Sequence, residues 1–144
     1  MGKCRVLLVD DHVPLRAALR SLLARYHDVR IVGEASDGQQ AIELMPFCQP
    51  DVILMDIDMP RMNGIEATAL IKRTWKEAIV VGLCAVEDHE YTDGILKAGA
   101  ATVIAKHQLD QLYSTIQLVC EKRLSARTSD AVSDSAVEFR STPP

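Results

Sequence analysis

The sequence predicts an α/β fold built on a doubly wound, five-stranded parallel sheet. Short runs rich in Val, Ile and Leu recur along the chain, and such runs are typical of strands that are buried on both faces. Between them lie segments whose apolar residues have helical spacing. Strict alternation of strand and helix predicts parallel strands joined by right-handed crossovers, with helices on both faces of the sheet.

The first two strands are expected at residues 3–9 and 29–35. Pro14 follows the first strand and suits the first turn of a helix, where a missing N–H costs nothing. The helix is then marked by one apolar stripe, made of Leu15, Leu19, Leu22, Leu23 and Tyr26.

Ser36 and Gln39 have the spacing of a helix capping box, so we expect the second helix to begin there. The same helix is expected to stop at Pro46, because proline cannot donate a backbone hydrogen bond. The remaining predicted elements are a strand ending at Asp56, a helix over 64–74 capped by Asn63, a strand over 78–85, a helix over 87–98, a strand over 101–105, and a last helix with Leu109, Leu112, Ile116, Val119 and Cys120 on one side.

A chain of 144 residues fits one domain, which we place at residues 1–124. Residues 125–144 are rich in Ser, Thr, Asp and Ala and lack an apolar stripe. This composition favours a flexible tail or linker stub; a short helix over 130–139 is the alternative.

Composition excludes several classes of protein. Sixteen Lys and Arg against twenty Asp and Glu give a net charge of -4, which argues against direct nucleic-acid binding by this segment. No run approaches the roughly 20 apolar residues that cross a membrane, and no signal peptide is evident, so we expect a cytoplasmic protein. The cysteines have no metal or disulfide spacing, so we expect reduced, buried thiols at Cys4, Cys48, Cys84 and Cys120.

Polar residues that could bind a ligand or take part in a reaction lie at the ends of four of the predicted strands. They are Asp10 and Asp11, then Asp56, Cys84 and Lys106. Because the carboxyl ends of parallel strands share one edge of the sheet, these side chains should converge. Clustered carboxylates call for a cation, and an all-oxygen ligand set favours Mg²⁺. A nearby lysine adds the charge that a phosphoryl group needs, which leaves the carboxylate of Asp56 as the natural nucleophile.

At this point the chain resembles the CheY-like receiver domain of two-component response regulators, over about residues 3–123. The resemblance is carried by the Asp10-Asp11 pair, by Asp56 in the pattern Asp-x-x-Met-Pro-x-Met-Asn-Gly, and by Lys106. The residues from Val32 to Gly38 are most similar to the subfamily with a C-terminal LuxR-type helix-turn-helix, and no such motif follows residue 124. The resemblance implies a flavodoxin-like (βα)5 fold with strand order 2-1-3-4-5.

The resemblance also implies roles for the site residues. Asp56 would accept a phosphoryl group from a sensor histidine kinase or a phosphotransfer protein, and Lys106 would pair with the phosphoryl oxygens. Asp11, Asp56 and the backbone carbonyl of Asp58 would bind Mg²⁺, and Asp10 would assist through water. Such a domain is no enzyme beyond its own phosphorylation and dephosphorylation. Its output partner is not identified by the sequence, and a homodimer is compatible with it.

The sequence departs from the family pattern at three positions. The family usually has Ser or Thr at the position of Cys84, and a thiol is a weaker hydrogen-bond donor than a hydroxyl. Val103 stands where an aromatic ring usually swings inward on activation, and Lys106-His107 replaces the common Lys-Pro pair. We therefore expect intact phosphorylation chemistry with an altered conformational switch.

Other functions remain open from the sequence. A pseudo-receiver, acting as a protein-interaction module without phosphorylation, is favoured by Cys84 and Val103. A haloacid-dehalogenase-type phosphohydrolase is suggested by Asp56-Ile57-Asp58, but such enzymes carry this motif on the first strand. The simpler alternatives for individual residues are that Asp10 and Asp11 only cap a helix and that Cys84 is a tolerated small residue; a redox-sensing thiol is another reading of Cys84.

Overall fold

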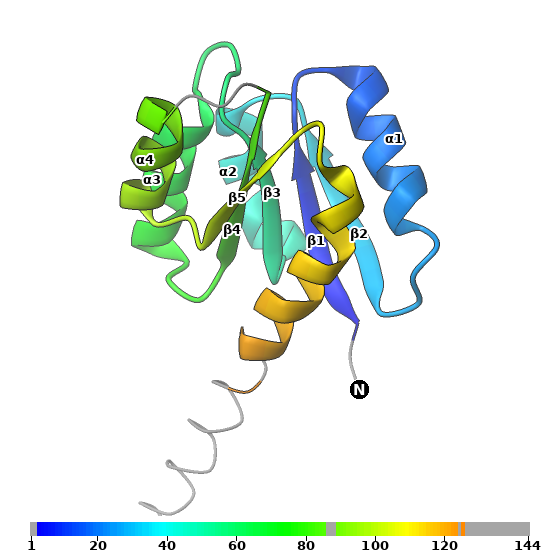
Figure 1. Ribbon diagram of the computed structural model, residues 1–144. Coiled ribbons are helices and arrows are strands. Elements are labelled where there is room, and N and C mark those ends of the chain that lie inside the picture. The colour runs from blue at the N-terminus through cyan, green and yellow to red at the C-terminus, as the bar shows by residue number, and fades with distance from the viewer. Residues whose placement is uncertain (1–2, 86–88, 124, 126–144) are drawn as a thin grey trace, which may run out of the picture.

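In the computed structural model, residues 3–85, 89–123 and 125 are described. They form one parallel sheet with the strand order β2-β1-β3-β4-β5 (Figure 1). The strands are β1 (Cys4–Val9), β2 (Val29–Ala35), β3 (Val52–Asp56), β4 (Ile79–Cys84) and β5 (Thr102–Ala105). The predicted fold class and strand order are confirmed.

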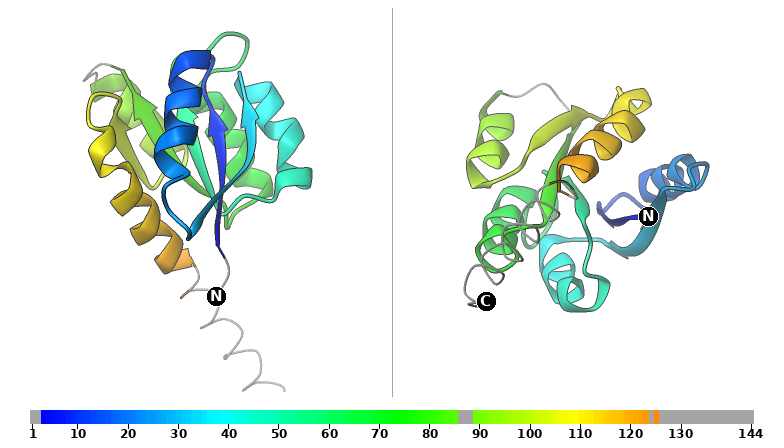
Figure 2. Two further views of the ribbon diagram at one scale, coloured as in Figure 1. Left: turned by 90° about the vertical axis from the view of Figure 1, so that its right-hand side faces the viewer. Right: turned by 90° about the horizontal axis from the view of Figure 1, so that it is seen from below.

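The sheet lies between two layers of helices (Figure 1, Figure 2). The labelled helices are α1 (Val13–Leu23), α2 (Gly38–Cys48), α3 (Gly64–Thr74) and α4 (His89–Ala98). A 3-10 turn, η1 (Leu109–Gln111), leads into a further helix over residues 112–123, which we call the C-terminal helix. Side chains of α1 and the C-terminal helix cover one face of the sheet, and those of α2, α3 and α4 cover the other.

Burial on both faces explains the apolar runs in the sequence. Along β1, Leu7 and Val9 pack in the layer of α2, α3 and α4, whereas Val6 and Leu8 pack in the layer of α1 and the C-terminal helix. The strand β3 repeats this alternation and is buried along its whole length. The apolar core therefore fixes β1 and β3, and with them the positions of the residues at their carboxyl ends.

The start and end of α2 differ from the prediction. Asp37, not Ser36, caps the helix, since its carboxylate accepts a hydrogen bond from the N–H of Gln40 at 2.8 Å. The N–H of Ser36 donates instead to the side chain of Gln40. Pro46 lies inside the helix, which continues to Cys48. It falls in the last turn, so the one hydrogen bond it removes does not end the helix.

The other predicted elements agree with the structure to within a few residues. Pro14 lies in the first turn of α1, and Asn63 caps α3 by accepting from the N–H of Glu66 at 2.9 Å. The predicted start of the fourth helix at residue 87 lies outside the described residues. So do the domain boundary at 124 and both expectations for the tail, the flexible segment and the helix over 130–139.

The expectation of four reduced thiols is wrong for two of them. Cys4 and Cys120 form a disulfide, with a Cα–Cα distance of 6.3 Å across 116 residues of sequence. Sequence spacing could not reveal the pair, because the fold alone brings the end of the C-terminal helix beside the start of β1 (Figure 1, Figure 2). Cys48 and Cys84 are buried elsewhere.

Across the described ranges, none of the helices combines the length and the apolar character needed to traverse a lipid bilayer.

Gly64 allows the first turn of α3 to touch the end of β3. A Cβ atom at this position would lie 2.1 Å from the carbonyl oxygen of Asp56 and 2.9 Å from the Cα of Ile57. Both neighbours are backbone atoms, so they cannot move aside as a side-chain tip could. The close approach is secured by a hydrogen bond from the N–H of Gly64 to the carbonyl of Ile57 at 2.9 Å.

We predict that Gly64→Ala destabilises the domain by about 1–3 kcal/mol, because the overpacked contact must push β3 or α3 aside. Thermal unfolding measures the effect as a fall in Tm of roughly 3–10 °C. Gly94→Ala is the matched control: its Cβ would meet mainly the flexible tip of Ile65, at 2.9 Å. An equal or larger fall in the control would contradict the backbone contact.

Candidate phosphoacceptor and metal site

Asp56 is the last residue of β3, and its position is set by the central strands. The strand pairs in parallel with β1 and with β4, where Asp56 lies opposite Leu83. The next residue continues the ladder, since the N–H of Ile57 donates to the carbonyl of Leu83 at 3.2 Å. The side chain of Asp56 is almost completely buried. The sheet therefore delivers a carboxylate to its edge with little freedom to move.

Asp10 and Asp11 follow the neighbouring strand β1. The N–H of Asp10 donates to the carbonyl of Ala35 at 3.0 Å, which extends the pairing of β1 with β2. Asp10 is fully buried, and its carboxylate accepts a hydrogen bond from the N–H of His12 at 2.9 Å. Asp11 is exposed at the rim. Carboxylate oxygens of Asp10, Asp11 and Asp56 lie within 4.8 Å of one another.

Lys106 completes the cluster from the other side. It follows β5, and its N–H donates to the carbonyl of Cys84 at 2.8 Å, at the end of β4. Its ammonium nitrogen lies 3.0 Å from a carboxylate oxygen of Asp10 and 3.0 Å from one of Asp56. One cation thus bridges two buried carboxylates that come from different strands.

The charges of the cluster shift the pKa values of its members. Burial, followed by the neighbouring carboxylate of Asp10, raises the pKa of Asp56 to about 7, although Lys106 opposes this shift. Burial acts to lower the pKa of Lys106, but its hydrogen bonds to Asp56 and Asp10 outweigh burial and raise it. Lysine alone therefore does not neutralise the three carboxylates, and the cluster favours a further cation.

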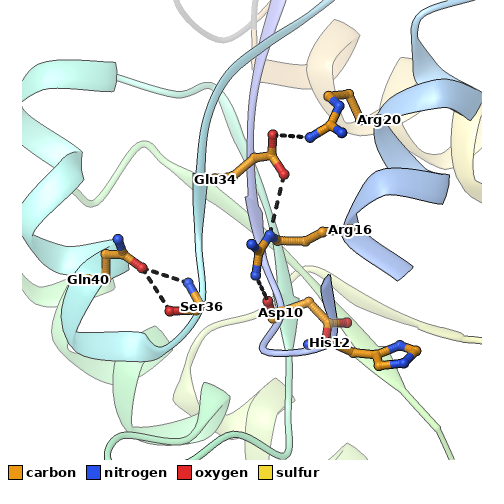
Figure 3. Close-up of polar contacts among 7 residues, drawn as sticks. All are labelled: Asp10, His12, Arg16, Arg20, Glu34, Ser36 and Gln40. Carbon is orange, nitrogen blue, oxygen red and sulfur yellow. Dashed lines mark hydrogen bonds and ion pairs between the residues drawn. The ribbon is translucent and has the colours of Figure 1, made fainter. Parts of the chain in front are cut away.

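A second cation supports the backbone of the acidic pair. Arg16, on α1, donates from Nη1 to the carbonyl of Asp10 at 2.6 Å, and its Nε lies 3.3 Å from Glu34 (Figure 3). Arg20 holds the other carboxylate oxygen of Glu34 at 2.6 Å. Sequence reasoning missed this network. The signal was present, since Arg16 and Arg20 are four residues apart and share one side of a helix.

The loop after Asp56 is fastened to the start of α2. The N–H of Gly38 donates to the carbonyl of Met62 at 3.1 Å, and Arg61 forms an ion pair with Asp37. Arg61 has a φ of 65°, the left-handed conformation that a tight turn requires. Asp58 lies in this loop with an exposed side chain, and its role as a carbonyl ligand stays a prediction.

The donor set fits Mg²⁺. Two buried carboxylates and one at the rim offer oxygen ligands within reach of a single ion, and the exposed side leaves room for the waters that Mg²⁺ retains. Asp10, Asp11 and Asp56 would hold the ion. Lys106 contacts one oxygen each of Asp10 and Asp56 and is the cation of the cluster that can pair with an anion.

The comparisons with known proteins agree with this geometry. Residues 6–117 match the family model of the response regulator receiver domain. The transcriptional regulatory protein DegU of Brevibacillus brevis is 33% identical over 121 residues, covering 83% of this chain and 51% of DegU. LiaR of Bacillus subtilis is 39% identical over 102 residues, covering 71% of this chain and 48% of LiaR. The chain therefore spans about half the length of these relatives.

Solved structures show the same architecture. The response regulator domain of Thermotoga maritima CheB is 31% identical with a TM-score of 0.77, and the match covers 83% of this chain and 97% of that domain. A LuxR-family response regulator from Aurantimonas is 28% identical with a TM-score of 0.79, and the match covers 85% of this chain and 88% of that chain. With the family model matching most of its length, the chain belongs to the receiver domains of two-component response regulators.

Proposed function

We propose that this receiver domain takes a phosphoryl group onto Asp56 in a Mg²⁺-dependent reaction. The observation that carries the proposal is the position of Lys106, 3.0 Å from the carboxylates of both Asp10 and Asp56. A lysine in that place is poised to pair with an anion attached to Asp56. A purely structural ion pair would not need a third carboxylate, Asp11, within 4.8 Å and open to solvent.

In the proposed reaction a carboxylate oxygen of Asp56 attacks the phosphorus of a phosphohistidine. The P–O bond forms as the P–N bond breaks, and the departing imidazole takes its electron pair and a proton from water. Lys106 moves its hydrogen bond from the carboxylate to the new phosphoryl oxygens. A bound Mg²⁺ would supply charge that offsets the carboxylates and the transferred group. The carboxylates of Asp10 and Asp11 would hold the Mg²⁺ beside Asp56.

The phosphodonor that the family implies is a sensor histidine kinase or a phosphotransfer protein in the cytoplasm. The relatives DegU and LiaR are named as transcriptional regulatory proteins, and this segment covers only half of each. We propose that the domain regulates an output partner by protein contact, as a monomer or as a homodimer, and that it catalyses no reaction besides its own phosphorylation and dephosphorylation.

The conformational switch of this receiver is proposed to be weak. Cys84 is the last residue of β4, and its carbonyl accepts a hydrogen bond from the backbone N–H of Lys106. A hydroxyl at this position would be a better donor to a phosphoryl oxygen than the thiol of Cys84. Val103 lies opposite Gly82 and packs against the core beside Ile95 of α4. A β-branched side chain is stiff and has no ring to reorient, so movement at Lys106 reaches α4 less effectively.

A second function is favoured by the same two residues. A pseudo-receiver would keep the fold and the acidic cluster as a structural feature, and would bind its partner without phosphorylation. The two functions differ in one outcome, since a pseudo-receiver carries no phosphoryl group on Asp56.

We predict that incubation with acetyl phosphate and Mg²⁺ adds one phosphoryl group to the wild type, seen by mass spectrometry or phosphate-affinity electrophoresis. Asp56→Asn should lose more than about nine-tenths of the label, because an amide is no nucleophile for this step. Asp93→Asn, which removes an exposed carboxylate on α4, is the matched control and should be labelled normally. Chelation of Mg²⁺ should abolish labelling. Wild-type labelling of Asp56→Asn would rule the assignment out.

We predict that Cys84→Thr strengthens coupling to α4. Phosphodonor should produce larger amide chemical-shift changes over His89–Ala98 in Cys84→Thr than in the wild type, because the hydroxyl adds a hydrogen bond to the phosphoryl group. Cys84→Ala is the control and should behave like the wild type. Equal shifts in all three proteins, at equal labelling, would show that residue 84 does not limit the switch.

A further inference from the structure

The disulfide between Cys4 and Cys120 lies at the opposite end of the sheet from Asp56. Cys4 is the first residue of β1, and Cys120 lies near the end of the C-terminal helix (Figure 2). Both side chains are more than nine-tenths buried. The disulfide takes no part in the chemistry proposed at Asp56, so the two sites are independent.

A carboxylate lies beside the two sulfur atoms. A carboxylate oxygen of Asp51 lies within 4.8 Å of both sulfur atoms, so a negatively charged group lies close to the pair. The carboxylate is itself held by the N–H of Arg5 at 3.0 Å, and Arg123 Nε lies 3.5 Å away. Both oxygens of this carboxylate are therefore held in place independently of the two cysteines.

The same contacts argue against a metal site at Cys4, Asp51 and Cys120. Both oxygens of Asp51 already face donors, the backbone N–H of Arg5 and the guanidinium of Arg123. A divalent cation would have to displace these donors and would sit beside a fixed positive charge. With no metal bound, the two cysteines can exchange between the thiol and disulfide states, and the thiolate is the reactive form of cysteine in that exchange.

The two cysteines border a small hollow. A hollow of about 80 Å³ is lined by both cysteines, together with residues of the C-terminal helix and of the start of β2 such as Gln117 and Val29. Each cysteine exposes little surface, but both border this hollow. The hollow is therefore the side from which a small reagent would approach the pair.

The bond holds the last turns of the C-terminal helix. Leu112 and Ile116 are fully buried and fix the first part of this helix to the sheet. Its end is held by the disulfide and by polar contacts of Arg123, which donates to the carbonyl of Glu77 at 3.1 Å. The disulfide is the one covalent link in this part of the described structure, so its loss loosens the end of the helix selectively.

We propose that Cys4 and Cys120 are a reversible redox site that clamps the end of the C-terminal helix to β1. A low-molecular-weight disulfide is the oxidant. One cysteine thiolate attacks it, forms a mixed disulfide and releases one thiolate; the second cysteine then displaces the other. The two protein thiols lose two electrons and two protons, and the small disulfide becomes two thiols.

The test equilibrates the 144-residue chain with mixtures of oxidised and reduced glutathione and then blocks remaining thiols with a maleimide. Mass spectrometry should show Cys4 and Cys120 losing their labels together as the mixture becomes oxidising, with loss of two hydrogens and no bound glutathione. The oxidised protein should have a Tm about 5–15 °C higher, because the bond closes a long loop, and slower amide exchange near the end of residues 112–123.

The variants separate this pair from the other cysteines. Cys4→Ser and Cys120→Ser should each abolish the redox-dependent change in Tm, and Cys48→Ser should retain it. Because a serine variant can lose stability, amide exchange of the wild type in its two redox states tests the clamp without any substitution. Labelling of Cys4 and Cys120 under every mixture would overturn the proposal. So would equal exchange in the two states, or one zinc ion retained per chain with the disulfide absent.

Discussion

The contact of Lys106 with Asp10 and Asp56 is the interaction on which the functional edge depends. It joins residues at the carboxyl ends of β5, β1 and β3, and β4 lies between β3 and β5. The lysine therefore reaches across the end of β4, and its backbone rests on Cys84. In the proposed switch, a change at Asp56 would therefore reach Lys106 first, and residue 84 at the end of the intervening strand would affect how the change passes to β4 and β5.

The two ends of the sheet carry different chemistry on the same scaffold. At the carboxyl ends of the strands, Asp56 contacts Lys106, which precedes η1 and the C-terminal helix in the chain. At the opposite ends, Cys120 holds the last part of that helix to Cys4. Between these two ends, buried apolar side chains pack on both faces of the sheet and restrict movement of its strands. Under the two proposals, phosphorylation acts at the carboxyl ends of the strands, and oxidation acts on the end of the C-terminal helix.

Much of this structure could be predicted from local patterns. Buried parallel strands need continuous apolar runs, so the five strands were evident, and polar residues directly after them mark the edge where ligands bind. Asn63 was recognisable as a cap because its side chain and the following turn form one local unit. The convergence of Asp10, Asp56 and Lys106 followed from strand polarity alone.

The errors have physical causes that lie outside local sequence. Asp37 replaced Ser36 as the cap because it also pairs with Arg61 in the loop after β3, a contact between distant segments. Pro46 did not end α2 because a proline in a last turn removes little. The disulfide joins residues 116 positions apart, and the support of Asp10 by Arg16 requires knowing how α1 packs. Each depends on tertiary contacts.

The measurement that tests the central claim most directly is fluorine NMR of beryllofluoride binding. Beryllofluoride mimics a phosphoryl group only where a carboxylate, a metal and a cation converge. Bound resonances should appear in the wild type only when Mg²⁺ is present and should be absent in Asp56→Asn. In Lys106→Ala the apparent affinity should fall about tenfold or more, the loss expected for a hydrogen bond to a charged group. No bound resonance in the wild type with Mg²⁺, or equal binding by Asp56→Asn, would contradict a phosphoacceptor site at the end of β3.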